Sequence, residues 1–187
     1  MTKRASAKYK RHARDFYATP EEPILKLIPH LSGKDFAEPM CGDGAIVRVL
    51  ESKGYKARFL ADLEPQGEMI GRARKKDVLD TTANDYVECS EVISNPPWPH
   101  PRQRGNPTVE IINHLINTQL WPVWFLLSAD FMHNKYFNEL APYCHKAISV
   151  GRVSWMDNGK SGYDNAVWYK FSFQRPRFAS GWFVPNL

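Results

Sequence analysis

Apolar residues form two kinds of pattern along this chain: short continuous runs, and stripes at helical spacing. The continuous runs predict β-strands. They occupy residues 34–39, 57–62, 91–94, 123–129, 146–153 and 165–173. Between them, Ile46, Val47 and Leu50 form a stripe on a helix that Gly54 is expected to end. Strands alternating with helices predict an α/β fold, with a mostly parallel sheet, helices on both faces and a terminal antiparallel hairpin on one edge.

Four further segments predict helices. In the first, Thr19 is expected to be the N-cap, Pro20 the first helical residue and Glu22 the partner in a capping box. Pro29 should limit this helix to about two turns. The other three are expected at residues 65–75, from Thr108 onward, and at 135–140.

The composition fits one globular domain. A chain of 187 residues is long enough for one compact domain and too short for two full ones. No apolar run approaches the roughly 18 residues that a membrane span requires, and no apolar segment of a secretory signal follows the basic start. Three cysteines without a CxxC pair argue against a disulfide framework and a cysteine zinc site, and favour a reducing cytoplasm.

The first residues are strongly basic in a chain whose net charge is +5. Seven of the first fourteen residues are Lys, Arg or His. We therefore divide the chain into a basic arm, residues 1–14, and a domain, residues 15–187. A solvated tail is the simplest interpretation of the arm. A basic arm on a basic domain also suits a polyanionic partner, because neutralised phosphates release counterions.

Glycines and polar side chains gather where the predicted strands end. Gly42 and Gly44 follow the first strand, Asp62 closes the second, Asp77 lies in the next loop, and Asn95 ends a buried run. In parallel α/β sheets, ligands bind beyond the carboxyl ends of the strands. These residues are therefore the candidates for a cofactor site.

Two cofactors suit such a site. The dinucleotide fingerprint G-x-G-x-x-G/A requires a small sixth residue, and Val47 stands there. Glu38, beside the glycine turn, would repel a pyrophosphate but would suit an amino group or a sulfonium. The electrostatics therefore favour S-adenosylmethionine over a nicotinamide dinucleotide.

Five motifs in this order resemble those of one enzyme family. They are DFYATP, AEPMCGDG, ADLEP, DVLD and SNPPW. Over roughly residues 15–175 the chain resembles small phage-type DNA adenine-N6 methyltransferases, whose cofactor motifs come first in the sequence. The resemblance implies a single Rossmann-like S-adenosylmethionine-dependent methyltransferase domain. It also implies a DNA partner, a monomer or homodimer, and the host bacterial cytoplasm if the gene is phage-encoded.

The resemblance also implies a set of residues that bind S-adenosylmethionine. They are Tyr17, Thr19, Glu38, Met40, Gly42, Asp62, Leu63, Asp77, Val78 and Asn95. Tyr17 and Thr19 would hold the methionine carboxylate, and Glu38 and the Gly42 turn would lie beside the amino-acid portion. Asp62 would bind the ribose, while Asp77 and the Val78 backbone N–H would meet the adenine. Each acid could instead be an ordinary surface or capping carboxylate, and Met40 is expected mainly to pack.

The tetrad Asn95, Pro96, Pro97 and Trp98 predicts the catalytic chemistry. The lone pair of an adenine amino group is delocalised into the ring, so acceptors on its two hydrogens would make the nitrogen more nucleophilic. The Asn95 side-chain oxygen and the Pro96 carbonyl can accept hydrogen bonds from these two hydrogens, and both are fixed dipoles. Trp98 offers a face for an extruded base, worth about 1–3 kcal/mol. Neither a metal nor a covalent nucleophile is required, and no cysteine follows a proline as cytosine-C5 methylation would need.

Other planar amines remain open as substrates. Enzymes with this type of tetrad also methylate adenine in RNA, cytosine N4 or a protein glutamine amide, and a binding protein that lost catalysis is a further alternative. Basic and aromatic residues favour nucleic acid, and DNA over RNA rests on the resemblance. The candidate contacts are Arg102, Arg104, Arg152, Trp155 and Lys160. Since the domain uses nearly the whole chain, sequence specificity should be short, relaxed or supplied by a partner.

Overall fold

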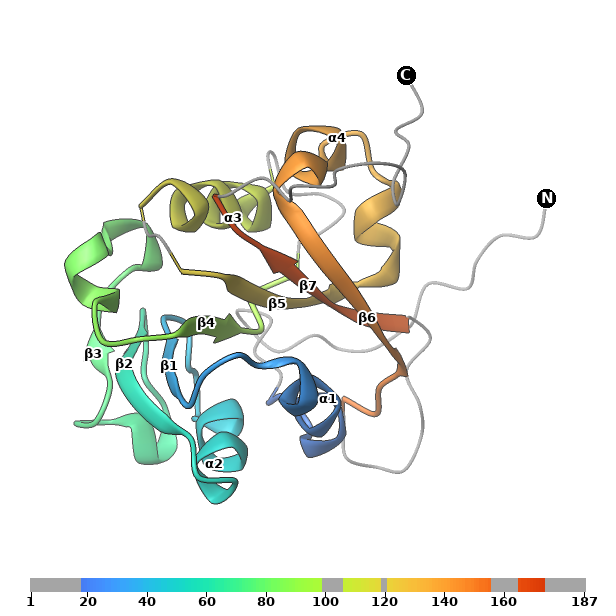
Figure 1. The fold of residues 1–187 in the computed structure, drawn as a ribbon. Coiled ribbons are helices and arrows are strands. Elements are labelled where there is room, and N and C mark those ends of the chain that lie inside the picture. Colours follow the sequence, from blue (N-terminus) through green and yellow to red (C-terminus); the bar gives the residue numbers. More distant parts are fainter. Residues whose placement is uncertain (1–17, 99–105, 119–120, 156–164, 174–187) are drawn as a thin grey trace.

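The computed structural model describes residues 18–98, 106–118, 121–155 and 165–173. These residues form a seven-stranded sheet in the order β3-β2-β1-β4-β5-β7-β6 (Figure 1). The strands are β1 Asp35–Glu38, β2 Lys56–Asp62, β3 Arg74–Lys75, β4 Glu91–Ser94, β5 Val123–Ser128, β6 Cys144–Arg152 and β7 Asn165–Phe171. The helices are α1 Glu21–Leu27, α2 Ala45–Ser52, α3 Pro107–Thr118 and α4 Phe137–Leu140.

Strand direction brings most of the carboxyl ends to one edge. Strands β1 to β5 are mutually parallel, and β7 lies antiparallel between β5 and β6. Strand β6 therefore runs in the same direction as the first five. Helices α1 and α2 lie on one side of the sheet, and α3 and α4 lie on the other (Figure 1). The predicted α/β fold, its mostly parallel sheet and its terminal antiparallel pair are confirmed.

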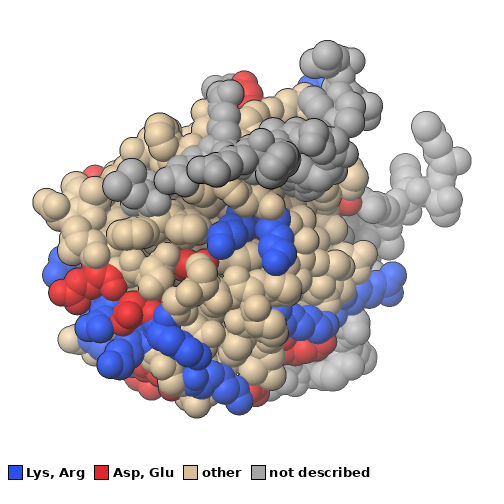
Figure 2. Space-filling model, in the orientation of Figure 1, with Lys and Arg blue, Asp and Glu red and all other residues tan. Residues whose placement is uncertain are grey.

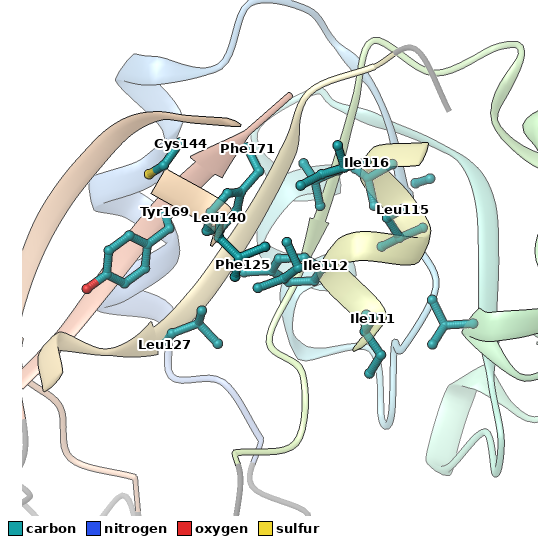
Figure 3. Close-up of a cluster of buried hydrophobic side chains, with 14 of the residues drawn as sticks. Ile111, Ile112, Leu115, Ile116, Phe125, Leu127, Leu140, Cys144, Tyr169 and Phe171 are labelled. Atoms are coloured by element: carbon teal, nitrogen blue, oxygen red, sulfur yellow. The ribbon is translucent and has the colours of Figure 1, made fainter. Parts of the chain in front are cut away.

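Each face of the sheet carries its own apolar core. On one face, Ile111, Ile112, Leu115 and Ile116 of α3 pack toward β5 (Figure 3). On the other face, buried residues of α1 and α2 belong to a second cluster, which also includes Trp124 and Leu126 of β5. Side chains of β5 alternate between the two cores, which explains its unbroken apolar run.

Trp168 belongs to the second core, as its place in an alternating strand predicts. Its side chain is fully buried, and Nε1 donates to the Pro23 carbonyl at 2.8 Å. This bond ties β7 to α1.

The amino end of β4 is fixed by a buried carboxylate. Glu91 is only 2% exposed. Its oxygens accept hydrogen bonds from Ser32 and Trp124 and form an ion pair with Lys170 at 3.0 Å. A buried charge with several donors satisfies its hydrogen-bonding capacity. The edge of the sheet opposite the strand carboxyl ends is therefore a structural anchor.

Two predicted features of local structure are wrong. Thr19 does not cap α1: the N-cap is Pro20, with no side-chain cap bond, because the Thr19 hydroxyl bonds to Asn95 instead. The helix expected at 65–75 is a 3₁₀ turn, Gly67–Met69, followed by β3. Gly67 and Gly71 have φ values of 53° and 80°, and Met69 alone in the turn is buried, so the segment has no apolar face to pack as a helix.

No helix within the described ranges combines the length and apolarity needed to cross a bilayer.

Two glycines with matched backbone angles allow a test of the turn before α2. Gly44, with φ 82°, lies so close to Met69 that an added Cβ would be 2.7 Å from its methyl carbon. Gly54, with φ 80°, has nothing within 4 Å. We expect Gly54→Ala to lower the free energy of unfolding by about 1–2 kcal/mol, the backbone cost alone. Gly44→Ala should lower it by roughly 1–3 kcal/mol more, because Met69 must also move. Urea unfolding measures both, and equal losses would contradict the close packing.

Candidate active site

The candidate site lies where strand order changes direction. The chain passes from β1 to its neighbour β2 on one side, and β4 pairs with β1 on the other. Glu38, Asp62 and Asn95 come from the carboxyl ends of these three strands. Ligands of open α/β sheets bind at such a switch point. The structure thus brings the main sequence-predicted residues to one edge.

Asp62 holds the glycine turn in place. Gly42 has φ 52°, and its N–H donates to Asp62 Oδ2 at 2.8 Å. The other carboxylate oxygen accepts from the Glu64 N–H, also at 2.8 Å. An ionised carboxylate has about four lone-pair sites, so Asp62 retains acceptor capacity for a ligand. Burial raises the Asp62 pKa, and the hydrogen bond from Gly42 opposes this effect.

Glu38 is a buried carboxyl without a complete set of partners. It is 2% exposed, and its Oε2 has no hydrogen-bond partner among the described residues. Burial raises its pKa well above the usual range, and the neighbouring negative charges of Asp62 and Asp43 add to this, while Arg48 opposes it. A positively charged ligand group beside Glu38 would stabilise its ionised form against burial and against the charges of Asp62 and Asp43.

Three hydrogen bonds hold the tetrad, each from a different element. Asn95 Nδ2 donates to Thr19 Oγ1 at 3.1 Å. Thr108 Oγ1 donates to the Pro97 carbonyl at 3.0 Å. Trp98 Nε1 donates to the Leu126 carbonyl of β5 at 3.1 Å. The amide oxygen of Asn95 is buried and has no partner among the described residues, so it can accept a hydrogen bond from a ligand.

Trp155 lies against Trp98. The two ring centroids are 5.3 Å apart, with an interplanar angle of 80°. Trp155 follows the end of β6, whose carboxyl end reaches the same edge as that of β4. The structure therefore brings Trp98, predicted to meet an extruded base, and Trp155, predicted to contact nucleic acid, into an edge-to-face pair.

Buried polar atoms without partners concentrate at this edge. Four such side-chain atoms occur among the described residues: Glu38 Oε2, Ser94 Oγ, Asn95 Oδ1 and Ser154 Oγ. All four lie at, or just beyond, the carboxyl ends of β1, β4 and β6. Buried polar groups are normally hydrogen-bonded. Their concentration here indicates a site built for a polar ligand.

The adenine side of the proposed cofactor site is less strongly marked. Asp77 accepts a hydrogen bond from the Leu79 N–H and so caps the 3₁₀ turn Val78–Asp80. Val78 is buried in the core, Met40 packs against that core, and Leu63, beside Asp62, is 62% exposed. Asp77 is therefore a capping carboxylate, as the sequence allowed for each acid. One of its oxygens accepts the capping hydrogen bond.

Several predicted contacts remain outside this picture. Tyr17, Arg102, Arg104 and Lys160 lie outside the described residues. Arg152 is exposed at the end of β6.

Two polar residues at the site carried no signal in the sequence. Ser154 belongs to no motif, and Thr108 was predicted only to open a helix, which in fact begins at Pro107. The role of Thr108 depends on a hydrogen bond to a residue 11 positions away, and Ser154 is distinguished only by its buried hydroxyl, which has no partner among the described residues; local spacing encodes neither feature.

The three cysteines are poor nucleophiles. Cys41, Cys89 and Cys144 are all free and buried. Burial raises the pKa of each thiol to about 12. For Cys41, the negative charges of Glu38 and Asp62 contribute further. Since the thiolate is the reactive form, a reaction through a cysteine adduct is disfavoured.

In the part of the chain that the structure describes, no group of three or more His, Cys, Asp or Glu is placed to hold a metal ion.

Solved structures with a similar fold include proteins described as methyltransferases. One is a proposed RNA methyltransferase from Pyrococcus horikoshii, with TM-score 0.59, 15% identity, and coverage of 87% of this chain and 90% of that one. Another is a proposed class I S-adenosylmethionine-dependent methyltransferase from Listeria monocytogenes, with TM-score 0.57, 14% identity, and coverage of 85% and 63%. A third is the modification subunit of a proposed type I restriction enzyme from Vibrio vulnificus, with TM-score 0.55, 12% identity, and coverage of 90% and 46%.

This chain has the Rossmann-like α/β fold of these structures. It spans less than two thirds of the Listeria and Vibrio proteins. No protein-family model and no curated protein sequence matches it significantly.

The raised pKa of Glu38 predicts how stability depends on pH. Because the folded state holds this proton more tightly than the unfolded state, its contribution to stability is greatest at low pH and is lost as pH rises above the unfolded pKa. Glu38→Gln removes the ionisable group. We expect the variant to be more stable than the parent at pH 8, with a difference that shrinks toward pH 4. Thermal unfolding across this range, without added ligand, measures the effect.

Glu91→Gln is the matched control, since Glu91 is equally buried but has several partners. It should lower the free energy of unfolding at pH 8 by roughly 1.5–3 kcal/mol. A Glu38→Gln variant that loses stability at pH 8, as this control does, would show that Glu38 is structurally paired.

Proposed function

We propose that this protein transfers a methyl group from S-adenosylmethionine to the N6 amino group of adenine in DNA. The observation that carries the proposal is the buried, unpartnered amide oxygen of Asn95. It lies at the carboxyl end of a central strand, directly before two prolines, and its amide nitrogen is held by Thr19. This is an oriented acceptor placed for a planar amine.

The residues around the glycine turn fit the cofactor. Glu38 supplies an unpaired buried carboxyl for the amino group or sulfonium, and Asp62 supplies acceptors for the ribose hydroxyls. Thr19 and Tyr17 are assigned to the methionine carboxylate, and Asp77 and Val78 to the adenine. The methyltransferase fold supports the same cofactor, which when bound supplies an electrophilic methyl group.

The tetrad would activate the amine by position alone. Asn95 Oδ1 and the Pro96 carbonyl accept its two hydrogens, which directs the nitrogen lone pair away from them. The Pro97 carbonyl is already occupied by Thr108, so it is a structural rather than a substrate contact. Fixed dipoles of this kind stabilise charge that develops only in the transition state. Trp98 and Trp155 would contact the extruded base.

The chain has an excess of basic residues, which suits a nucleic-acid substrate, and this excess is unevenly distributed along the sequence. The described residues contain 14 Lys and Arg and 17 Asp and Glu, and the remaining residues contain 11 and 3. Figure 2 shows that many of the basic side chains on the face drawn alternate with acidic ones. Arg48 and Arg58, for example, each pair with two acids. The net positive charge of the chain therefore comes from the arm and the other segments outside the described residues.

Short or relaxed sequence specificity is expected because the described helices and strands include no separate element for reading bases. The described helices and strands all belong to the sheet or to the layers that cover it. A reader of the major groove normally presents a helix or ribbon with several side chains at base edges. We assign recognition to the segments 98–107 and 157–165, and their short length predicts that few bases are specified.

The decisive experiment is transfer of a labelled methyl group to DNA, RNA and protein in parallel, followed by digestion and identification of the modified unit. We expect N6-methyladenine in DNA. Product in RNA alone, in protein alone, or as a methylated cytosine would overturn the proposed substrate, and no product in any polymer would overturn the proposed activity.

The proposed pair of acceptors for the target amine, Asn95 Oδ1 and the Pro96 carbonyl, is called the clamp below and is tested by Asn95→Ala. We expect turnover to fall by at least about 100-fold, the effect of removing one preorganised transition-state contact. Cofactor affinity, measured by calorimetry, should change much less. Asn113→Ala, on the exposed face of α3, is the control and should leave both unchanged. Turnover of Asn95→Ala within a few-fold of the parent would rule the clamp out.

The arm is tested by the dependence of DNA affinity on salt. Deleting residues 1–14 should weaken binding and reduce the logarithmic salt slope by about 0.9 for each phosphate that the protein no longer neutralises. A second variant, of unchanged length, has the six Lys and Arg of the arm replaced by Gln. The two variants should agree if charge is responsible, and an unchanged slope would make the arm a passive tail.

A further inference from the structure

Helix α3 contacts both halves of the candidate site. Near its beginning, Thr108 bonds to the tetrad, and six residues later His114 bonds to the loop that follows the proposed adenine-binding turn. Six residues of α-helix span about 9 Å. Helix α3 therefore contacts both the amine clamp and the turn Val78–Asp80, called the cofactor turn below because the cofactor adenine is assigned to it.

Thr108 holds a carbonyl of the tetrad beyond the end of the strand ladder. Two adjacent prolines have no N–H to donate, so the chain beyond β4 cannot continue a strand ladder. Thr108 is fully buried, and its hydroxyl donates to the Pro97 carbonyl at 3.0 Å. The position of the Pro96 carbonyl, one residue earlier, depends on this bond and on the Asn95–Thr19 bond on its other side.

His114 fastens the cofactor turn. Its Nε2 lies 3.1 Å from the Thr81 carbonyl oxygen, which can only accept, so Nε2 carries the proton. Nδ1 lies 3.4 Å from the Thr118 hydroxyl oxygen. The Thr81 hydroxyl donates to the Val78 carbonyl at 2.6 Å and accepts from Tyr86 at 2.8 Å. This chain of bonds runs from α3 to the turn that Asp77 begins.

We propose that Thr108 and His114 are positioning residues through which α3 sets the distance between the cofactor and the target amine. Thr108 positions the acceptors of the clamp, and His114 positions the turn that holds the cofactor adenine. This proposal rests on the proposed function. It assigns the two residues separable effects, one on turnover and one on cofactor affinity.

The Thr108 half is tested by an isosteric pair. Thr108→Val keeps the side-chain shape and removes the hydroxyl, whereas Thr108→Ser keeps the hydroxyl. Because small displacements of reacting groups reduce rates by up to about 100-fold, we expect kcat of Thr108→Val to fall roughly 10- to 100-fold. Its KM for cofactor should stay within about twofold of the parent value, since the cofactor turn is untouched. Thr108→Ser should recover most of the turnover.

The His114 half predicts the opposite pattern. His114→Leu should raise the cofactor dissociation constant about tenfold, with kcat at saturating cofactor within a few-fold of the parent value. His114→Gln can still donate to the Thr81 carbonyl from its amide nitrogen and should restore affinity. Calorimetry with S-adenosylhomocysteine measures this binding without turnover.

A purely structural role would lower thermal stability without separating kcat from cofactor affinity. Thermal unfolding therefore accompanies each variant, and Thr108→Ala serves as the second variant if valine does not fold at the assay temperature. An active parent with equal kcat in the valine or alanine and the serine variants would overturn the Thr108 half. Equal affinity of the leucine and glutamine variants would overturn the His114 half. A parent protein that methylates no polymer would overturn the proposed function, and this proposal with it.

Discussion

The arrangement of this site depends on how the chain is held after β4, where two prolines end the strand ladder. The tetrad loses the regular backbone hydrogen bonds of the sheet at the point where its geometry matters most. Bonds from Thr19, Thr108 and the Leu126 carbonyl replace them. The segment before α1, helix α3 and strand β5 all converge on these four residues. The fold can be understood as the frame that brings three distant segments to one short loop.

Two equally buried glutamates, one at the amino end of a strand and one at the carboxyl end of another, differ in their hydrogen-bond partners. Glu91, at the start of β4, has its charge matched by Lys170 and by several donors. Glu38, at the end of β1, is equally buried but has an oxygen without a partner among the described residues. One edge therefore stabilises the fold, while the other keeps unsatisfied polar groups at a cost in stability. Buried polar groups without partners are a recognised mark of functional sites.

Elements whose signal is local could be predicted from the sequence, and contacts between distant residues could not. The apolar runs predicted the buried strands, and the placing of Asp62 and Asn95 at strand ends was sufficient to bring them to one edge. The helix expected at 65–75 failed because two glycines and the lack of an apolar face outweighed the propensity of the intervening residues. The cap expected at Thr19 failed because its hydroxyl serves a residue 76 positions away. Thr108 escaped notice because its hydrogen bond joins it to the tetrad 11 positions earlier, and Ser154 because the burial of its hydroxyl has no signal in the sequence.

The separation of charge between the described residues and the rest of the chain has a consequence for how such a protein can change. The described residues carry slightly more acid than base, so attraction to a polyanion is not built into the residues that form the sheet and its cores. Basic residues of the arm and of the segments 99–105 and 156–164 can be added or removed without changing any residue of β5 or of the tetrad. Recognition of a new polymer, or of a new base context, could then evolve by exchange of these segments while the residues assigned to the proposed methyl transfer are inherited unchanged.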